Sequence, residues 1–426
     1  MDIIFNQNEH TTGSLKTQKL SGVKTINFNP FHPDFYQNPY PMYHRLRSEE
    51  PIHKSVMGMW VLTRYIDVKA VLWDPRFRTD QLPKRLAEKG QRIEQLEFDS
   101  LTIAISKWLL FLDPPDHTRL RRIASKALLH WTGERIRPLI CTTVEELLSK
   151  VRYTGFMDII ADFASPLPTI VIAKMLGVPE ADHNQLHRWS DELFHHIFEP
   201  LISLEGYEYL NQISQKFIEY FQGLIAEREK NPQDDLLSFL IAGRDQGEHL
   251  SEDELLSICI VLFSAGEQTT SNLIGNGMLA LLRHPEQMEK LKQEPNIIQS
   301  AVEELLRYDS STQIVAREAL EDVVIGGQTI RSGEQVFLCL GAANRDPAQF
   351  PNPDCLDFTR SENCHLAFGS GIHYCVAAAQ ARSQGQIAIN ALVQQLPNLR
   401  FQTETLEWRK HMILRSLKAL PVTFVL

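Results

Sequence analysis

Cys375 is the residue around which the chemistry of this sequence is most clearly organised. It lies in the segment HLAFGSGIHYCVAAAQAR, from His365 to Arg382. Gly369 and Gly371 allow backbone angles and close approaches that a side chain would forbid, so this loop can wrap tightly around a sulfur atom. The Ala-rich run that follows predicts a helix beginning at or just after Cys375. Its free N–H groups and its dipole would favour the thiolate, the form that ligates iron.

A lone cysteine in apolar surroundings is more often a small buried hydrophobe than a metal ligand, so Cys375 needs support from its neighbours. The remaining cysteines form no CxxC pair and no zinc-like spacing, which favours a reduced, intracellular setting. They are Cys141, Cys259, Cys339, Cys355 and Cys364.

A long helix is predicted from Ser251 to Arg283. Ser251 and Glu254 form a capping-box pattern at its start, and His284 with the following proline marks its end. At about 1.5 Å per residue the helix would be about 50 Å long, enough to cross a domain. Its apolar residues cover nearly all faces in the first half, which predicts a buried helix.

The middle of this helix carries AGEQTT, from Ala265 to Thr270. Gly266 costs a helix interior about 0.5–1 kcal/mol relative to alanine, so a reason for it is worth seeking. Without a side chain, a flat ring or dioxygen could lie against the backbone. Thr269 could bond a carbonyl three or four residues back and loosen the helix. A small-residue packing notch is the alternative explanation for Gly266 alone.

The segment LDPPDHTRLRRIASKAL predicts a helix with two cationic faces. His117 and Arg121 are four residues apart and share one face, whereas Arg119, Arg122 and Lys126 lie on another. An ordinary solvated basic helix would explain any one of these residues.

Taken together, these motifs resemble the cytochrome P-450 superfamily, the haem-thiolate monooxygenases. AGEQTT is similar to the family's oxygen-activating pattern Ala-Gly-x-acid-Thr-Thr, and the basic helix is similar to its DPPxHTRLRR run. The resemblance covers roughly Asn38 to Leu426. The family's cysteine-loop pattern, Phe-Gly-x-Gly-x-His-x-Cys, is matched by Phe368, Gly369, Gly371, His373 and Cys375.

The resemblance implies a mainly α fold with a small β region (α+β), in which heme b lies between the long central helix and the Cys-ligand loop. Residues 26–426 would form a single monooxygenase domain. The polar segment 1–25 is predicted to be a flexible N-terminal arm. Two lid helices would lie within residues 183–230. Cys375 would be the axial ligand of the haem iron.

The resemblance also implies roles for individual residues. His117, Arg121, Arg317 and His373 would hydrogen-bond the haem propionates, because anions favour charge-assisted donors. The second cationic face would meet an electron donor. The full set of cofactor-binding positions that it implies is His117, Arg121, Ala265, Gly266, Arg317, Phe368, Gly369, His373 and Cys375.

Glu304 and Arg307 form a Glu-x-x-Arg pair, which is buried and structural in the family. An exposed ion pair worth a few tenths of a kcal/mol is the alternative. The family's third partner is an arginine, and Cys355 occupies the matching place. We therefore expect an incomplete triad, for which Arg360 does not compensate.

The sequence departs from the family at the acid position of the central helix, which holds Gln268. A carboxylate stands one residue earlier, at Glu267. Glutamine relays hydrogen bonds but cannot donate and recover a proton as a carboxylate does. Either Glu267 or water substitutes, or proton delivery is altered. The catalytic candidates are thus Thr269, Glu267 and Gln268. Smaller departures are Ala377 for glycine and Gln380 for leucine.

The implied function is a monooxygenase that activates dioxygen and oxidises a small organic, secondary-metabolite-like substrate, with hydroxylation as the first expectation. Because no GxGxxG stretch for flavin or nicotinamide is present, electrons would come from a ferredoxin with its ferredoxin reductase. One alternative is oxidative coupling or cyclisation of an aromatic substrate. A haem-binding sensor or non-catalytic helper is less favoured, because Cys375 and Thr269 are both retained.

The net charge and the distribution of apolar residues limit where the protein is expected to be located and what it is expected to bind. The formal net charge of −10 argues against binding to nucleic acid or to an anionic membrane. The N-terminus lacks a signal-peptide pattern, and no apolar run approaches the roughly 20 residues that span a bilayer. We therefore expect a cytoplasmic protein without a membrane anchor.

Overall fold

The computed structural model describes residues 26–79, 82–84, 99–133, 135–198, 202–245, 250–403 and 405–426, so the predicted arm at 1–25 lies outside the described residues. The helices are α1 Pro33–Gln37, α2 Tyr40–Glu49, α3 Tyr65–Trp73, α5 Asp99–Ser106, α6 Asp116–Leu129, α7 Ile136–Val151, α8 Pro166–Leu176, α9 His183–His196, α10 Leu204–Lys230, α11 Leu236–Asp245, α12 Glu252–Arg283, α13 Pro285–Gln293, α14 Ile298–Tyr308, α15 Leu340–Ala343 and α16 Ala378–Gln395. The strands are β1 Ile52–Lys54, β2 Trp60–Leu62, β3 Phe77–Thr79, β4 Phe156–Asp158, β5 Ile314–Ala319, β6 Val323–Ile325, β7 Gln328–Ile330, β8 Gln335–Cys339, β9 Arg400–Phe401 and β10 Pro421–Thr423.

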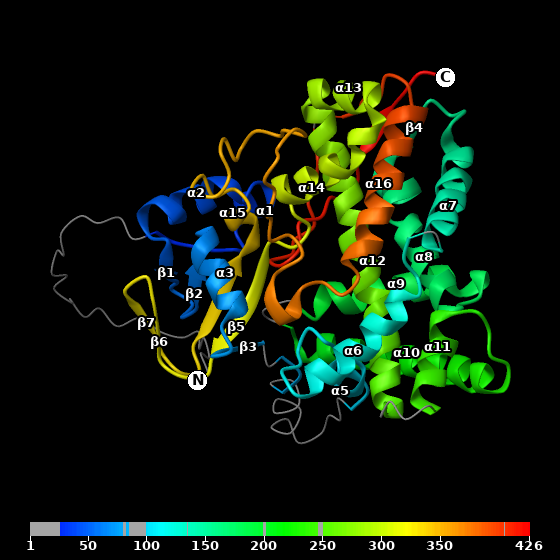
Figure 1. Ribbon diagram of the computed structural model, residues 1–426, viewed down its shortest axis with the longest axis horizontal. Helices are drawn as coiled ribbons and strands as arrows, with labels where there is room; N and C mark the ends of the chain where they lie inside the picture. Colours follow the sequence, from blue (N-terminus) through cyan, green and yellow to red (C-terminus); the bar gives the residue numbers. More distant parts are fainter. Residues whose placement is uncertain are drawn as a thin grey trace, which may run out of the picture.

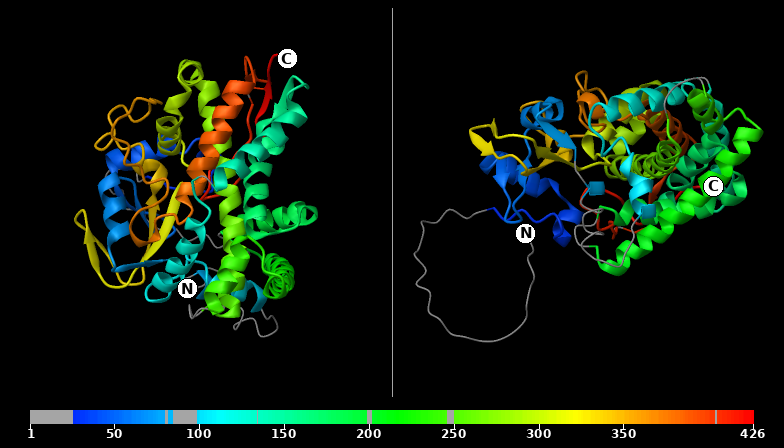
Figure 2. Two further views of the ribbon diagram at one scale, coloured as in Figure 1. Left: turned by 45° about the vertical axis from the view of Figure 1, so that its right-hand side comes forward. Right: turned by 90° about the horizontal axis from the view of Figure 1, so that it is seen from below.

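The longer helices gather on one side of the molecule, whereas the main sheet lies on the other side together with α2, α3 and α15 (Figure 1). The main sheet has the strand order β1-β2-β8-β5-β3, with β2 and β8 parallel and its other pairs antiparallel. Two views from other directions show the same division (Figure 2). The predicted α+β class is therefore confirmed. For the site, β5 matters most because it carries Arg317, which is paired in register with Thr79 of β3.

Helix α12 is the buried centre of the helical side. It begins at Glu252 after the N-cap Ser251, and both hydrogen bonds of the predicted capping box with Glu254 are present. It ends at Arg283, as its sequence predicts. Helices α5, α8, α9, α14 and α16 pack around it, so most of its side chains are buried. This environment explains why α12 is apolar on nearly all faces.

One helical stretch is more apolar than the sequence patterns led us to expect. Ile159–Leu176, which joins a short π-helix to α8, is long and apolar enough to cross a bilayer by length and composition alone. However, 61% of it is buried inside the fold, where α8 packs against α7 and α12. Contact with the protein core therefore accounts for its apolar character.

The Glu304–Arg307 pair on α14 is fully buried, so it is not an exposed surface pair. Arg307 donates two hydrogen bonds of 2.8 Å to the Glu304 carboxylate, and it also donates to the backbone carbonyls of three residues between 344 and 355. The expectation of an incomplete triad is wrong. Arg360 Nε lies 3.1 Å from Glu304 Oε2 and supplies the third partner in place of Cys355.

Candidate active site

One side of the buried helix α12 is accessible. Half-exposed residues recur at Val261, Ala265, Gly266, Gln268 and Thr269, while most other residues of the helix are buried. Their spacing places them along one side of the helix. The Thr269 hydroxyl donates to the Ala265 carbonyl over 3.0 Å, which is the local bond that the sequence predicts. A Cβ added at Gly266 would make only ordinary contact with α8, so packing against α8 does not require glycine at this position.

The cysteine loop is held by short-range backbone contacts. The Cys375 N–H donates to the Phe368 carbonyl over 2.9 Å, which folds the loop back on itself. Gly369 and Gly371 both have positive φ, at +70° and +71°. A Cβ at Gly371 would also lie 2.5 Å from the Leu72 carbonyl oxygen, so only glycine fits there. The predicted tight turn around the sulfur is therefore present.

The surroundings of Cys375 act in opposite directions on the pKa of its thiol. Helix α16 begins at Ala378, and so not directly at Cys375. Burial raises the pKa of the Cys375 thiol, whereas the Ala377 N–H and the guanidinium groups of Arg121 and Arg382 lower it. These groups therefore favour the thiolate without outweighing burial. A bound metal cation would deprotonate the thiol outright.

Four basic residues that are distant in sequence gather near the loop. The ring centroids of His117 and His373 lie 4.2 Å apart. The positive charges of Arg121 and Arg317 act electrostatically on both imidazoles. Burial and these charges lower the pKa of His117 and bring that of His373 down to about 3. Both imidazoles are therefore neutral near pH 7. Neither nitrogen of the buried His117 ring has a protein partner, so the cluster has capacity to bind an anion.

These features fit a haem group. A flat cofactor needs an accessible strip beside α12, a sulfur ligand on a tight loop and donors for two propionates, and the described residues supply all three. The structure brings together His117, Arg121, Arg317, His373 and Cys375 as predicted. Arg119 of the second cationic face pairs with Glu254 and so links α6 to the start of α12.

The two polar residues before Thr269 both contact α9. Glu267 is fully buried, and its carboxylate bonds the His187 ring. Gln268 Nε2 donates to Asp191 Oδ1 over 3.0 Å, and Asp191 in turn pairs with Arg409. Sequence reasoning missed His187, Asp191 and Arg409. No local spacing could have indicated them, because only tertiary packing brings α9 and the C-terminal loop to α12.

The buried His187–Glu267 pair predicts a pH-dependent stability. Burial lowers the pKa of His187, but the hydrogen bond and charge of Glu267 outweigh it and the net pKa is raised. Burial raises the pKa of Glu267, against the opposing effect of His187. Both groups therefore bind protons more tightly in the folded state. Each group therefore stabilises the folded state at a pH below its pKa in the unfolded chain, which is 4.5 for Glu267 and 6.5 for His187. This stabilisation is lost as the pH rises through the higher pKa of the folded state.

We therefore expect the free energy of unfolding of the unmodified protein, relative to the double variant His187→Gln/Glu267→Gln, to fall as pH rises above 6.5. Urea titrations of both proteins at a series of pH values measure this difference. A difference that stays constant or grows with pH would contradict the raised pKa values of His187 and Glu267.

A cysteine loop, an accessible strip on a buried helix and an anion-binding basic cluster together define a haem-thiolate oxygenase. The comparison with known proteins agrees. The chain matches the family model for cytochrome P450 over residues 42–413, and it belongs to the cytochrome P450 family. It is a monooxygenase that uses heme b, and the predicted fold and cofactor are confirmed.

Two relatives and one solved structure illustrate the similarity. The biotin biosynthesis cytochrome P450 of Bacillus subtilis is 43% identical over 405 residues, covering 94% of this chain and 100% of the relative. The polyketide biosynthesis cytochrome P450 PksS of the same organism is 39% identical, covering 94% and 99%. The crystal structure of P450BioI in complex with hexadec-9Z-enoic acid ligated acyl carrier protein has a TM-score of 0.84 at 42% identity, covering 92% and 100%.

Proposed function

We propose that this monooxygenase hydroxylates a small organic, secondary-metabolite-like substrate with electrons from a ferredoxin and its ferredoxin reductase. The proposal rests on the presence in one chain of the tight Cys375 loop and of the accessible strip of α12 around Thr269. When bound, heme b supplies the activation of dioxygen and the oxidising power. The protein supplies the axial ligand, the anchor, the pocket and the path for protons.

Each group of residues has a distinct task in this proposal. The Cys375 Sγ would bind the iron, and the positive φ angles of Gly369 and Gly371 give the loop the turn that carries this sulfur. His117 and His373, with Arg121 and Arg317, hold the propionates and so fix the orientation of the ring. Ala265 and Gly266 leave room beside the helix for the ring and for dioxygen. Phe368 and Gly369 border the ring on the cysteine side.

An aromatic cluster, formed by Trp108, Phe111, Phe194 and Phe198, packs in the main hydrophobic core beside α9. The Trp108 ring stacks on that of Phe111 at 5.9 Å and on that of Phe194 at 6.1 Å, which joins the segment after α5 to the end of α9. Phe198 lies 5.2 Å from Phe194 and closes the cluster. The similarity to a polyketide biosynthesis cytochrome P450, and to a cytochrome P450 solved with a fatty-acyl acyl carrier protein, favours an elongated, largely aliphatic substrate.

Hydroxylation is separable from the alternatives by experiment. An optical screen for compounds that displace iron-bound water would identify ligands, and turnover of a ligand under labelled dioxygen would follow. We expect one labelled oxygen atom in the product. An unlabelled product would indicate oxidative coupling or cyclisation of an aromatic substrate. Failure of every ligand to increase consumption of reductant would favour a sensor or helper.

The electron donor and the location of the protein stay predictions. The ferredoxin assignment rests on the lack of a flavin- or nicotinamide-binding stretch in the sequence. We place the donor beside α6, at the basic face that includes Arg122 and Lys126. A cytoplasmic location fits the predicted soluble donor. Reconstitution with a ferredoxin and its reductase, compared with a flavodoxin pair, tests the choice.

We infer that Thr269 controls how protons reach oxygen. Its hydroxyl bonds the Ala265 carbonyl on the accessible side of α12, where it can also bond a water or dioxygen. We expect Thr269→Ala to raise the ratio of hydrogen peroxide to product by about a hundredfold, the lower end of the usual contribution of a positioned proton-transfer group. The neighbouring Thr270, which is buried, provides the matched control Thr270→Ala. Equal peroxide yields in the two variants would contradict this role.

A further inference from the structure

We propose that Asp191, on α9, is a positioning residue that orients the Gln268 amide at the acid position of α12. This inference rests on the proposed oxygen pocket at Thr269. The acid position of α12 holds Gln268, and its side chain does not end in solvent. Its Nε2 lies 3.0 Å from Asp191 Oδ1 and 3.4 Å from the Asp191 backbone oxygen. The Asp191 carboxylate of α9 therefore contacts Gln268, the residue that occupies the acid position of α12.

The contact with Asp191 fixes the orientation of the Gln268 amide. An ionised carboxylate only accepts hydrogen bonds, so the amide must present its NH₂ group to Asp191. Its carbonyl oxygen is then turned away from Asp191. Because Gln268 and Thr269 both lie on the accessible side of α12, that oxygen becomes an oriented acceptor for a water molecule in the proposed pocket. A primary amide free to rotate would present either group and would hold no defined water.

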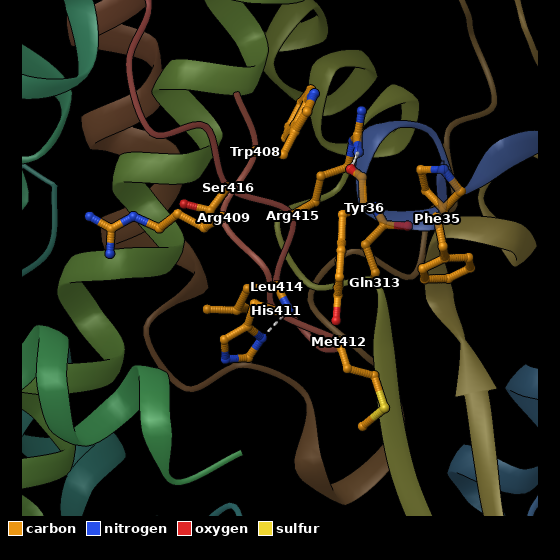
Figure 3. A pocket seen from close by; sticks show the side chains of 11 residues that line it. Phe35, Tyr36, Gln313, Trp408, Arg409, His411, Met412, Leu414, Arg415 and Ser416 are labelled. Atoms are coloured by element: carbon orange, nitrogen blue, oxygen red, sulfur yellow. Dashed lines mark hydrogen bonds between the residues drawn. The ribbon is translucent and has the colours of Figure 1, made fainter. Parts of the chain in front are cut away.

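Arg409 holds Asp191 in place from a third element. Its Nη1 lies 2.7 Å and 2.9 Å from the two Asp191 carboxylate oxygens. Arg409 stands in the C-terminal loop, where its N–H bonds the Ser416 carbonyl over 2.8 Å. In the close view of this loop, the Arg409 side chain extends away from Arg415 and Gln313 (Figure 3). The loop therefore directs one arginine toward α9 and α12 and the other toward the N-terminal segment.

The other carboxylate on α12 is already engaged. Glu267 forms a hydrogen bond with His187, which lies one helical turn before Asp191 on α9. The neighbouring residue of α12, Gln268, contacts Asp191 itself. This arrangement leaves Asp191 as the carboxylate in contact with Gln268. In the proposal Asp191 transfers no proton through Gln268, because an amide cannot take up and release one as a carboxylate does. Asp191 acts by holding the amide, and water with Thr269 carries the proton.

A purely structural ion pair is the competing explanation. Asp191 and Arg409 are each about one-third exposed, and pairs of that kind contribute little to stability. The two explanations differ in what a neutral variant changes. If Asp191 only joins α9 to the C-terminal loop, its replacement alters stability and leaves the pocket unchanged. If Asp191 orients Gln268, the polarity of the pocket changes as well.

The test compares Asp191→Asn with the control Glu192→Gln in the holoenzyme. Both changes remove one negative charge from α9, but Glu192 pairs with His196, whereas Asp191 accepts the hydrogen bond from Gln268. The first readout is the carbon–oxygen stretch of carbon monoxide bound to the reduced protein, which reports pocket polarity without turnover. We expect Asp191→Asn to shift or split this band, because an asparagine can present either its oxygen or its nitrogen to Gln268. Glu192→Gln should leave the band unchanged.

The second readout is the ratio of hydrogen peroxide to product. We expect Asp191→Asn to raise it about fivefold, the difference between a charged and a neutral hydrogen-bond partner. Adding Gln268→Glu to Asp191→Asn restores a carboxylate on α12 and should lower the ratio again. An Asp191→Asn protein with an unshifted band and an unchanged ratio would overturn the inference, even if its stability fell. An unmodified protein with no thiolate-type carbon monoxide spectrum would instead refute the underlying haem site.

Discussion

Replacing Cys375 with serine is expected to abolish the red-shifted carbon monoxide band of the reduced protein and to reduce turnover below detection. A serine hydroxyl is not deprotonated near neutral pH and cannot donate electron density to iron as a thiolate does. We expect the variant to retain heme b, because the basic cluster around His117 and His373 still binds the propionates. The reduced carbon monoxide difference spectrum, with haem content measured separately, makes this comparison.

Cys364→Ser is the matched control, because Cys364 is exposed and precedes the same loop. It should give the spectrum and the turnover of the unmodified protein. A Cys375→Ser protein that keeps the red-shifted band would show that another atom ligates the iron.

Arg307→Leu is expected to lower the free energy of unfolding by about 3–5 kcal/mol, the usual cost of leaving one partner of a buried ion pair unpaired. Glu304 and Arg307 are almost completely inaccessible, and Arg307 also satisfies three backbone carbonyls of the segment before the cysteine loop. Removing it therefore leaves a buried carboxylate with Arg360 as its remaining cation. Urea denaturation of the holoenzyme, followed by circular dichroism, measures the change.

The surface pair Arg45–Glu49 on α2 provides the control. Both side chains are about half exposed, so Arg45→Leu should change stability by less than about 1 kcal/mol. A double variant Glu304→Leu/Arg307→Leu should cost less than the sum of its single changes, because each single change already breaks the contact between the two residues. Equal, small effects of Arg307→Leu and Arg45→Leu would contradict a structural role for the buried pair.

The features that were predicted correctly depend on short stretches of sequence. The capping box fixes the start of α12, and the bond from Thr269 to the Ala265 carbonyl lies within one helical turn. The turn at Gly371 depends on a positive φ, which glycine adopts readily. In each case the physical cause lies within a few residues or in a backbone conformation, so the residue types alone indicate it.

The features that were missed depend on contacts across the fold. Arg360 completes the buried triad because the chain folds back over α14, although Cys355 occupies the expected position. Gln268 faces Asp191 because α9 packs on α12. The helix after the cysteine loop begins at Ala378, where the backbone first becomes helical, and an Ala-rich composition does not define that boundary. Such details require the three-dimensional arrangement.

The central claim is that the Cys375 sulfur would be a ligand of the haem iron. X-ray absorption at the iron edge of the purified holoenzyme measures it directly. We predict one sulfur atom in the first coordination shell of the unmodified protein and none in the Cys375→Ser variant. A first shell that contains only nitrogen and oxygen atoms in the unmodified protein would contradict the account.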